Sequence, residues 1–124
     1  MTLDEFRVEM ASYRRSADDD AKSLKDPYVT LEKLRGLYEK FDDGERRMAD
    51  QVLIEWALSE DEELRFDGLA LIDELKIATA VAALYELATR LASSTEVSAP
   101  YELKKVHRII AGLGLLGTGT GTAR

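Results

Sequence analysis

The sequence predicts an all-α protein, built as a compact bundle or short solenoid of about six helices. Apolar residues recur every three or four positions along most of the 124 residues, the spacing that places them on one face of a helix. Several of these segments begin with serine, threonine or aspartate followed three positions later by glutamate, a pattern typical of helix starts. The periodicity and the capping patterns therefore both favour helices.

The first predicted helix is long and covers residues 3–24. Thr2 and Glu5 have the spacing of a capping box, in which each side chain accepts a hydrogen bond from the backbone N–H of the other residue. One apolar face continues along this helix. Its members are Leu3, Phe6, Met10, Tyr13, Ala17, Ala21 and Leu24.

Two shorter helices follow, the first to about Phe41 and the second to about Leu58. The dipeptide Asp26-Pro27 predicts the first start, because aspartate caps a helix and proline needs no hydrogen-bond partner in the first turn. Asp42 and Glu45 predict the second start through another capping box. The two apolar faces consist of Leu31, Leu34, Leu37 or Tyr38 and Phe41, and of Ala49, Val52, Leu53, Trp56 and Ala57. We expect Trp56, the only tryptophan, to lie in the core.

Residues 59–93 are the central unit, predicted to be two helices joined by a tight turn over Lys76–Thr79. Ser59 and Glu62 have capping-box spacing, and the acidic residues after Ser59 suit the positive end of the helix dipole. The apolar positions are Leu64, Gly68, Leu71 or Ile72 and Leu75 in the first helix, and Val81, Leu84, Leu87 or Ala88 and Leu91 in the second. This unit is expected to be a helical hairpin.

A final helix is predicted from Ser98-Ala99-Pro100 to residue 113, with Leu103, Val106, Ile109 or Ile110 and Leu113 on its apolar face. It carries the one basic patch, formed by Lys104, Lys105 and Arg108. The glycine- and threonine-rich residues 114–124 predict a flexible tail. We therefore expect a single helical domain over 1–113, followed by this tail.

Composition and charge limit the kind of partner. The chain has no cysteine, so thiolate metal sites and cysteine nucleophiles are excluded. The net charge is −7, and residues 45–97 carry twelve of the acidic side chains against five basic ones. Such a field disfavours nucleic acid and anionic membranes and attracts a basic protein. We expect a cytoplasmic protein, because the first residues resemble no secretory signal and no apolar run is long enough for a membrane span.

The motifs that suggest chemistry do not have the required context. Gly112, Gly114 and Gly117 match the glycine pattern of a dinucleotide site, but they follow a helix instead of a strand. His107 is the only histidine, and a lysine stands where a Glu-x-x-His metal pair needs an acid. The run Asp18–Asp20 lacks the spacing of a calcium loop. We therefore predict no catalytic site, no metal and no cofactor.

The stretch DEELRFDGLALIDELKIATAVAALYELATRL resembles a HEAT repeat. It has a charged start, an apolar stripe, a turn after Asp73-Glu74-Leu75 and a second helix with Val81, Leu84 and Leu87 at repeat spacing. The resemblance extends weakly over 27–58 and to half a unit over 99–113, with the helix 3–24 as an N-terminal cap. HEAT-like modules generally bind proteins, so the resemblance implies a scaffold or adaptor and not an enzyme.

The predicted function is therefore non-catalytic binding of a basic protein partner through an acidic helical face. The residues expected to form this face are Glu60, Asp61, Glu63, Arg65, Asp67 and Asp73. A small acidic protein of this kind also resembles bacterial immunity proteins, which neutralise a basic toxin by charge complementarity. Two alternatives are a self-associating structural protein, such as a homodimer, and a helical-bundle enzyme that uses His107.

Overall fold

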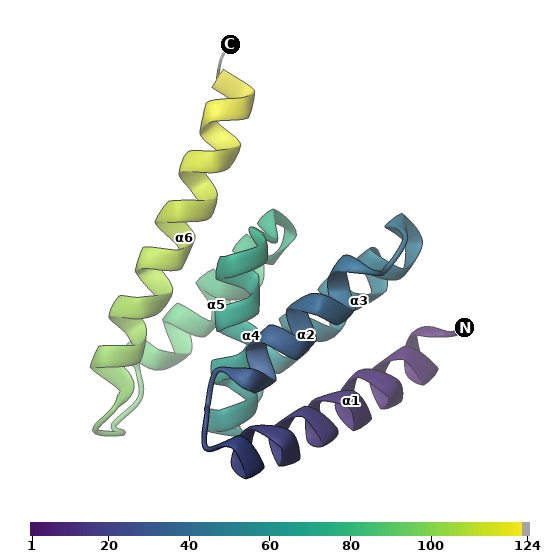
Figure 1. The fold of residues 1–124 in the computed structure, drawn as a ribbon. Helices are drawn as coiled ribbons and strands as arrows, with labels where there is room; N and C mark the ends of the chain where they lie inside the picture. Colours follow the sequence, from purple (N-terminus) through teal and green to yellow (C-terminus); the bar gives the residue numbers. More distant parts are fainter. Residues whose placement is uncertain (123–124) are drawn as a thin grey trace. The chain divides into compact units, whose positions relative to one another are not determined.

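The structure is a computed structural model that describes residues 1–122, with side chains described up to residue 114. The described part contains six α-helices, one short 3-10 helix and no strand (Figure 1). The prediction of an all-α fold is confirmed. The elements are α1 (Leu3–Leu24), α2 (Val29–Glu39), α3 (Asp43–Ala57), α4 (Glu62–Leu75), η1 (Ala78–Ala80), α5 (Val81–Ala92) and α6 (Ala99–Thr122).

The chain forms two compact units, Met1–Leu53 and Ile54–Arg124, and the single domain over 1–113 stays a prediction. The boundary falls inside α3. Hydrophobic periodicity locates each helix and its apolar face, but it does not say which helices pack against each other. The division into units therefore could not be predicted from the periodicity alone.

In the first unit, α1 packs along α2 (Figure 1). The contact includes Phe6 and Phe41, whose ring centroids lie 5.0 Å apart at 58°. In the same contact between α1 and α2, the buried Thr30 hydroxyl donates a 2.7 Å hydrogen bond to the Asp18 carboxylate. The buried residues of α1 are Phe6, Met10, Ala17 and Ala21, as predicted. Tyr13 and Leu24, expected on the same face, are 37% and 66% exposed. Leu24 is exposed because α1 ends there and the chain turns at the left-handed residue Lys25.

The predicted capping boxes of this unit are both present. At α1, the Glu5 N–H donates to Thr2 Oγ1 at 3.2 Å and the Thr2 N–H donates to Glu5 Oε1 at 3.0 Å. At α3, the matching bonds between Asp42 and Glu45 are 2.8 and 3.0 Å long. The α2 start differs from the prediction, because the Asp26 carboxylate accepts a bond from the Tyr28 N–H and the helix begins only at Val29.

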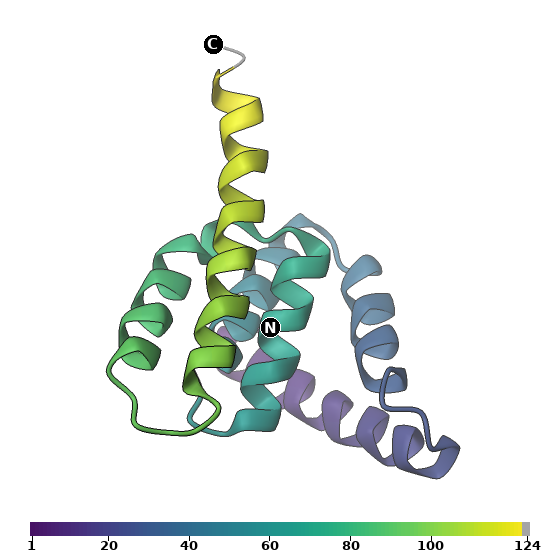
Figure 2. The same cartoon turned by 90° about the vertical axis from the view of Figure 1, so that its left-hand side faces the viewer.

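In the second unit, α6 contacts α5, α4 and η1, and Figure 2 shows it lying between α5 and α4. The main neighbour of α5 is therefore α6, although the sequence led us to expect α4 and α5 to form the central hairpin. The buried side chains come from every helix of the unit. They include Trp56, as expected, and Leu69, Leu71, Ile72, Leu84, Leu87, Val106, Ile109 and Leu113.

The backbone of α6 continues to Thr122, whereas the sequence predicts a flexible tail over 114–124. Glycine and threonine are weak helix formers, but adding a residue to a helix that residues 99–113 have already nucleated costs less than starting a new helix. Residues 123–124 lie outside the described part. Within residues 1–122, no helix is both long and apolar enough to cross a membrane.

The first unit contains a tyrosine with a strongly shifted pKa. Tyr38 donates a 2.8 Å hydrogen bond to the carboxylate of Asp50, whose own pKa is raised by burial. Burial, with help from this hydrogen bond and the Asp50 charge, raises the pKa of Tyr38 to about 12. The neutral phenol is thus the form that the folded state favours.

We predict that this hydrogen bond makes the protein sensitive to alkali. A raised folded-state pKa contributes stability that is fully present below the unfolded value of about 10 and is lost as pH rises toward the folded value. The absorbance of tyrosinate, followed against pH, should show one phenol of the wild type titrating near pH 12. This late step should be missing in Tyr38→Phe. The prediction is wrong if the difference between the two proteins titrates near pH 10.

Candidate functional site

The candidate site lies where α4 and α6 begin and α5 ends. The N-terminal cap of α4 is Asp61, whose carboxylate accepts hydrogen bonds from the N–H groups of Glu63 and Leu64 at 3.0 and 3.3 Å. The predicted capping box of Ser59 and Glu62 is therefore wrong. Both Ser59 and Asp61 are good capping residues, but the Ser59 hydroxyl already accepts from the Asp61 N–H at 3.1 Å. The helix starts two residues later as a result.

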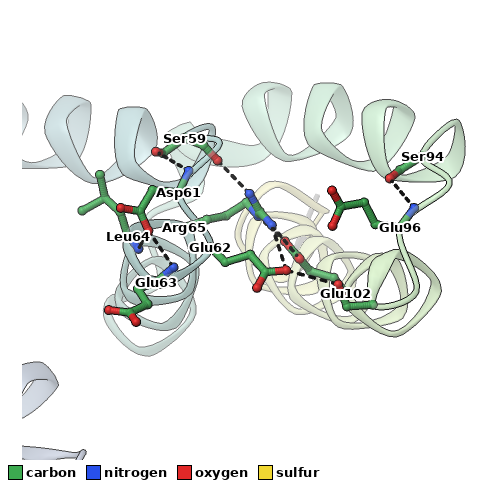
Figure 3. A network of polar contacts seen from close by, with 10 residues as sticks. Ser59, Asp61, Glu62, Glu63, Leu64, Arg65, Ser94, Glu96 and Glu102 are labelled. Atoms are coloured by element: carbon green, nitrogen blue, oxygen red, sulfur yellow. Dashed lines mark hydrogen bonds and ion pairs between the residues drawn. The ribbon is translucent and has the colours of Figure 1, made fainter.

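Arg65 is the central side chain of the site. It leaves α4 one turn after the cap and binds both carboxylate oxygens of Glu102 on α6, with Nε donating to Oε2 and Nη2 donating to Oε1 at 3.0 Å (Figure 3). Its Nη1 donates to the Ser59 carbonyl at 2.9 Å. Arg65 is only 9% exposed, so its charge depends on these partners. Hydrogen bonding to Glu102 raises the pKa of the Arg65 guanidinium further.

Beside this pair is a hollow of about 480 Å³, which we call the acidic hollow. Its walls come from the start of α4, the end of α5, the loop before α6 and the start of α6. The lining residues are Glu60, Glu62, Arg65, Leu87, Arg90, Leu91, Ser94, Glu96, Ser98, Ala99 and Glu102. Four carboxylates and two guanidinium groups thus share a hollow of the size of many ligand pockets.

The charges of the acidic hollow are not balanced. Arg65 is neutralised by Glu102, and the other guanidinium group, that of Arg90, donates to the backbone carbonyl of Leu58 at 3.0 Å. Glu62 lies 4.0 Å from Arg65 and accepts a 3.2 Å hydrogen bond from the Ser98 hydroxyl. Glu60 and Glu96 are exposed to solvent. The exposed carboxylates of Glu60 and Glu96, at the rim of the hollow, are therefore available to an incoming cation. Arg65 and Arg90 instead donate hydrogen bonds to acceptors of the protein itself.

The structure distributes the six predicted partner-binding residues over different environments. Glu60 is exposed and lines the hollow, whereas Glu63 is exposed outside its lining. Asp61 is exposed but caps α4. Asp73 lies about three turns after Asp61, with an oxygen 3.5 Å from Lys76 Nζ.

Two of the six positions require a correction. Arg65 and Asp67 are 9% and 7% exposed, so they do not belong to an exposed acidic face. The expected stripe is buried at Gly68, Leu71 and Ile72, and Arg65, Asp67 and Leu69 are buried beside it. The buried face of α4 is thus wider than the expected stripe, and it also covers Arg65 and Asp67.

Sequence reasoning missed the residues that complete the hollow, namely Glu62, Arg90, Glu96, Ser98 and Glu102. One signal was available. Glu102 falls at helical spacing between Ala99 and Val106, both buried residues of the last helix. An acidic residue on a core-facing stripe needs a buried partner of opposite charge, and an arginine on another stripe can supply it.

His107, the candidate general base, is exposed on α6. It is not among the residues that line the acidic hollow. Among the described residues, no group of three or more histidine, aspartate or glutamate side chains is arranged to hold a metal ion.

Comparison with known proteins gives no relative, because no family model, no curated protein and no solved structure matches the chain.

We predict strong coupling between Arg65 and Glu102. Replacing Arg65 by Met should lower the free energy of unfolding by about 3 kcal/mol, because a largely buried carboxylate loses its partner. Glu102→Gln should cost a similar amount, and the double variant should cost less than the sum of the two. Urea unfolding of the four proteins measures this difference. Additive effects would show that the two side chains do not depend on each other.

Proposed function

We propose that this protein is a non-catalytic protein-interaction module that binds a basic segment of a partner protein in the acidic hollow. A lysine or arginine side chain of the partner would enter between Glu60, Glu62 and Glu96. Its charge would be met by carboxylates that the fold has already brought together. Charge complementarity of this kind increases the association rate and the specificity of a complex.

The observation that carries the proposal is the internal pairing of Arg65. Arg65 donates two hydrogen bonds to Glu102 and lies at the limit of ion pairing, 4.0 Å, from Glu62, so the exposed charges of the hollow remain mostly negative. The Glu62 carboxylate is held in place by the Ser98 hydroxyl at 3.2 Å, so part of the site is ordered before a partner arrives. Such preorganisation lowers the entropy cost of binding.

The finer identity of the module is also part of the proposal. The resemblance of residues 59–92 to a HEAT repeat supports a protein partner over a small substrate. The net charge of −7 supports a basic partner. Neutralisation of a basic toxin in the bacterial cytoplasm is the specific role that agrees with both features.

We predict that the binding of a basic partner depends on Glu60 and Glu96. A tagged wild-type protein and the variant Glu60→Lys/Glu96→Lys are used to capture partners from host lysate. The captured protein is then purified and its affinity measured by calorimetry. The variant should weaken the affinity at least about a hundredfold, and added salt should weaken the wild-type complex.

The matched control is Asp19→Lys/Glu32→Lys, which makes the same change in net charge at exposed positions of the other unit. This control should bind like the wild type, and circular dichroism should show that all three proteins remain helical. Equal weakening in both variants would show that only the overall charge matters. An affinity that neither variant changes would rule out the acidic hollow as the binding site.

A further inference from the structure

A second surface of the same unit carries the opposite charge. Tyr101, Lys104, Lys105 and Arg108 line a hollow of about 310 Å³ on α6, which we call the basic hollow. The four positions are i, i+3, i+4 and i+7 of one helix, so their side chains are neighbours on one face of that helix. Three cationic groups and one phenol therefore surround one point.

The cations of the basic hollow are not neutralised from within the protein. Among the described residues, none of the three has a carboxylate within ion-pairing distance. Glu102, the acid on the same turn of α6, binds Arg65 instead. The pairing that orders the acidic hollow thus leaves the basic hollow with an excess of positive charge.

Lys105 is the most constrained of the three cations. Its ammonium group lies 4.1 Å from the centroid of the Phe66 ring on α4, and this contact restricts the position of the side chain. Burial lowers the pKa of Lys105, against the attraction of Glu102. An anion placed in the hollow would compensate this lost solvation, whereas Lys104 and Arg108 remain exposed and free to approach such an anion.

We propose that the basic hollow binds a terminal phosphate group, carried by a peptide as a monoester or present as inorganic phosphate. A phosphate dianion has three terminal oxygens for the three cationic groups, whereas a carboxylate has two oxygens and half the charge. An extended nucleic acid fits less well, because the rest of the chain is strongly acidic and would repel a long polyanion. This site shares no exposed residue with the acidic hollow, so the two proposals can fail independently.

Calorimetric titration tests the proposal with three probes: inorganic phosphate, a phosphoserine peptide and the same peptide with unmodified serine. The wild type should bind a phosphate-bearing probe saturably, and Lys104→Gln/Arg108→Gln should weaken this binding at least about tenfold. The unmodified peptide should not bind. Tighter binding of the phosphoserine peptide than of inorganic phosphate would identify a peptide-borne group, and equal binding would identify the phosphate alone.

The matched control is Arg15→Gln/Lys22→Gln, which removes two exposed cations from α1. It should bind like the wild type, with circular dichroism confirming that both variants are helical. The single variant Lys104→Gln provides a milder test if the double variant loses helicity. The proposal is overturned if no phosphate-bearing probe saturates the wild type below about 10 mM. It is also overturned if both double variants bind equally.

Discussion

The bidentate bond between Arg65 and Glu102 is the interaction on which the second unit depends most. It joins the start of α4 to the start of α6, and it also ties both helices to the Ser59 carbonyl. A guanidinium group that is largely removed from water is costly unless it is paired with an opposite charge and hydrogen bonded. The fold meets this requirement with three donated bonds, and in doing so it fixes how the two helix starts lie against each other.

The same pairing affects which charges remain exposed on the surface of this unit. Glu102 uses both oxygens on Arg65, so neither residue contributes an unpaired charge to its surroundings. On one side, carboxylates are left around the acidic hollow, and on the other, cations are left around the basic hollow. Two surfaces of opposite charge therefore follow from one internal pair. The acidic surface supports the proposed binding of a basic protein, and the basic surface supports the proposed binding of phosphate.

The sequence predicts features that depend on local chemistry. The capping boxes at Thr2 and Asp42 were correct because each bond joins residues three positions apart, and the burial of Trp56 followed from its helical face. Features that depend on tertiary structure could not be predicted in the same way. Competition between Ser59 and Asp61 decided where α4 begins, and a partner 37 positions away decided that Arg65 is buried. The predicted binding face therefore contained Glu60 but not Glu96, which only folding brings to the same hollow.

The central claim is that Arg65 is held inside the fold by Glu102. Nuclear magnetic resonance of the arginine Nε–H groups tests it directly, because a hydrogen-bonded, buried Nε–H exchanges slowly with water. The structure predicts a slowly exchanging Nε–H signal of Arg65, assigned by its loss in Arg65→Met, and fast exchange of that signal in Glu102→Gln. An Arg65 signal that exchanges as fast as those of exposed arginines in the wild type would contradict the account.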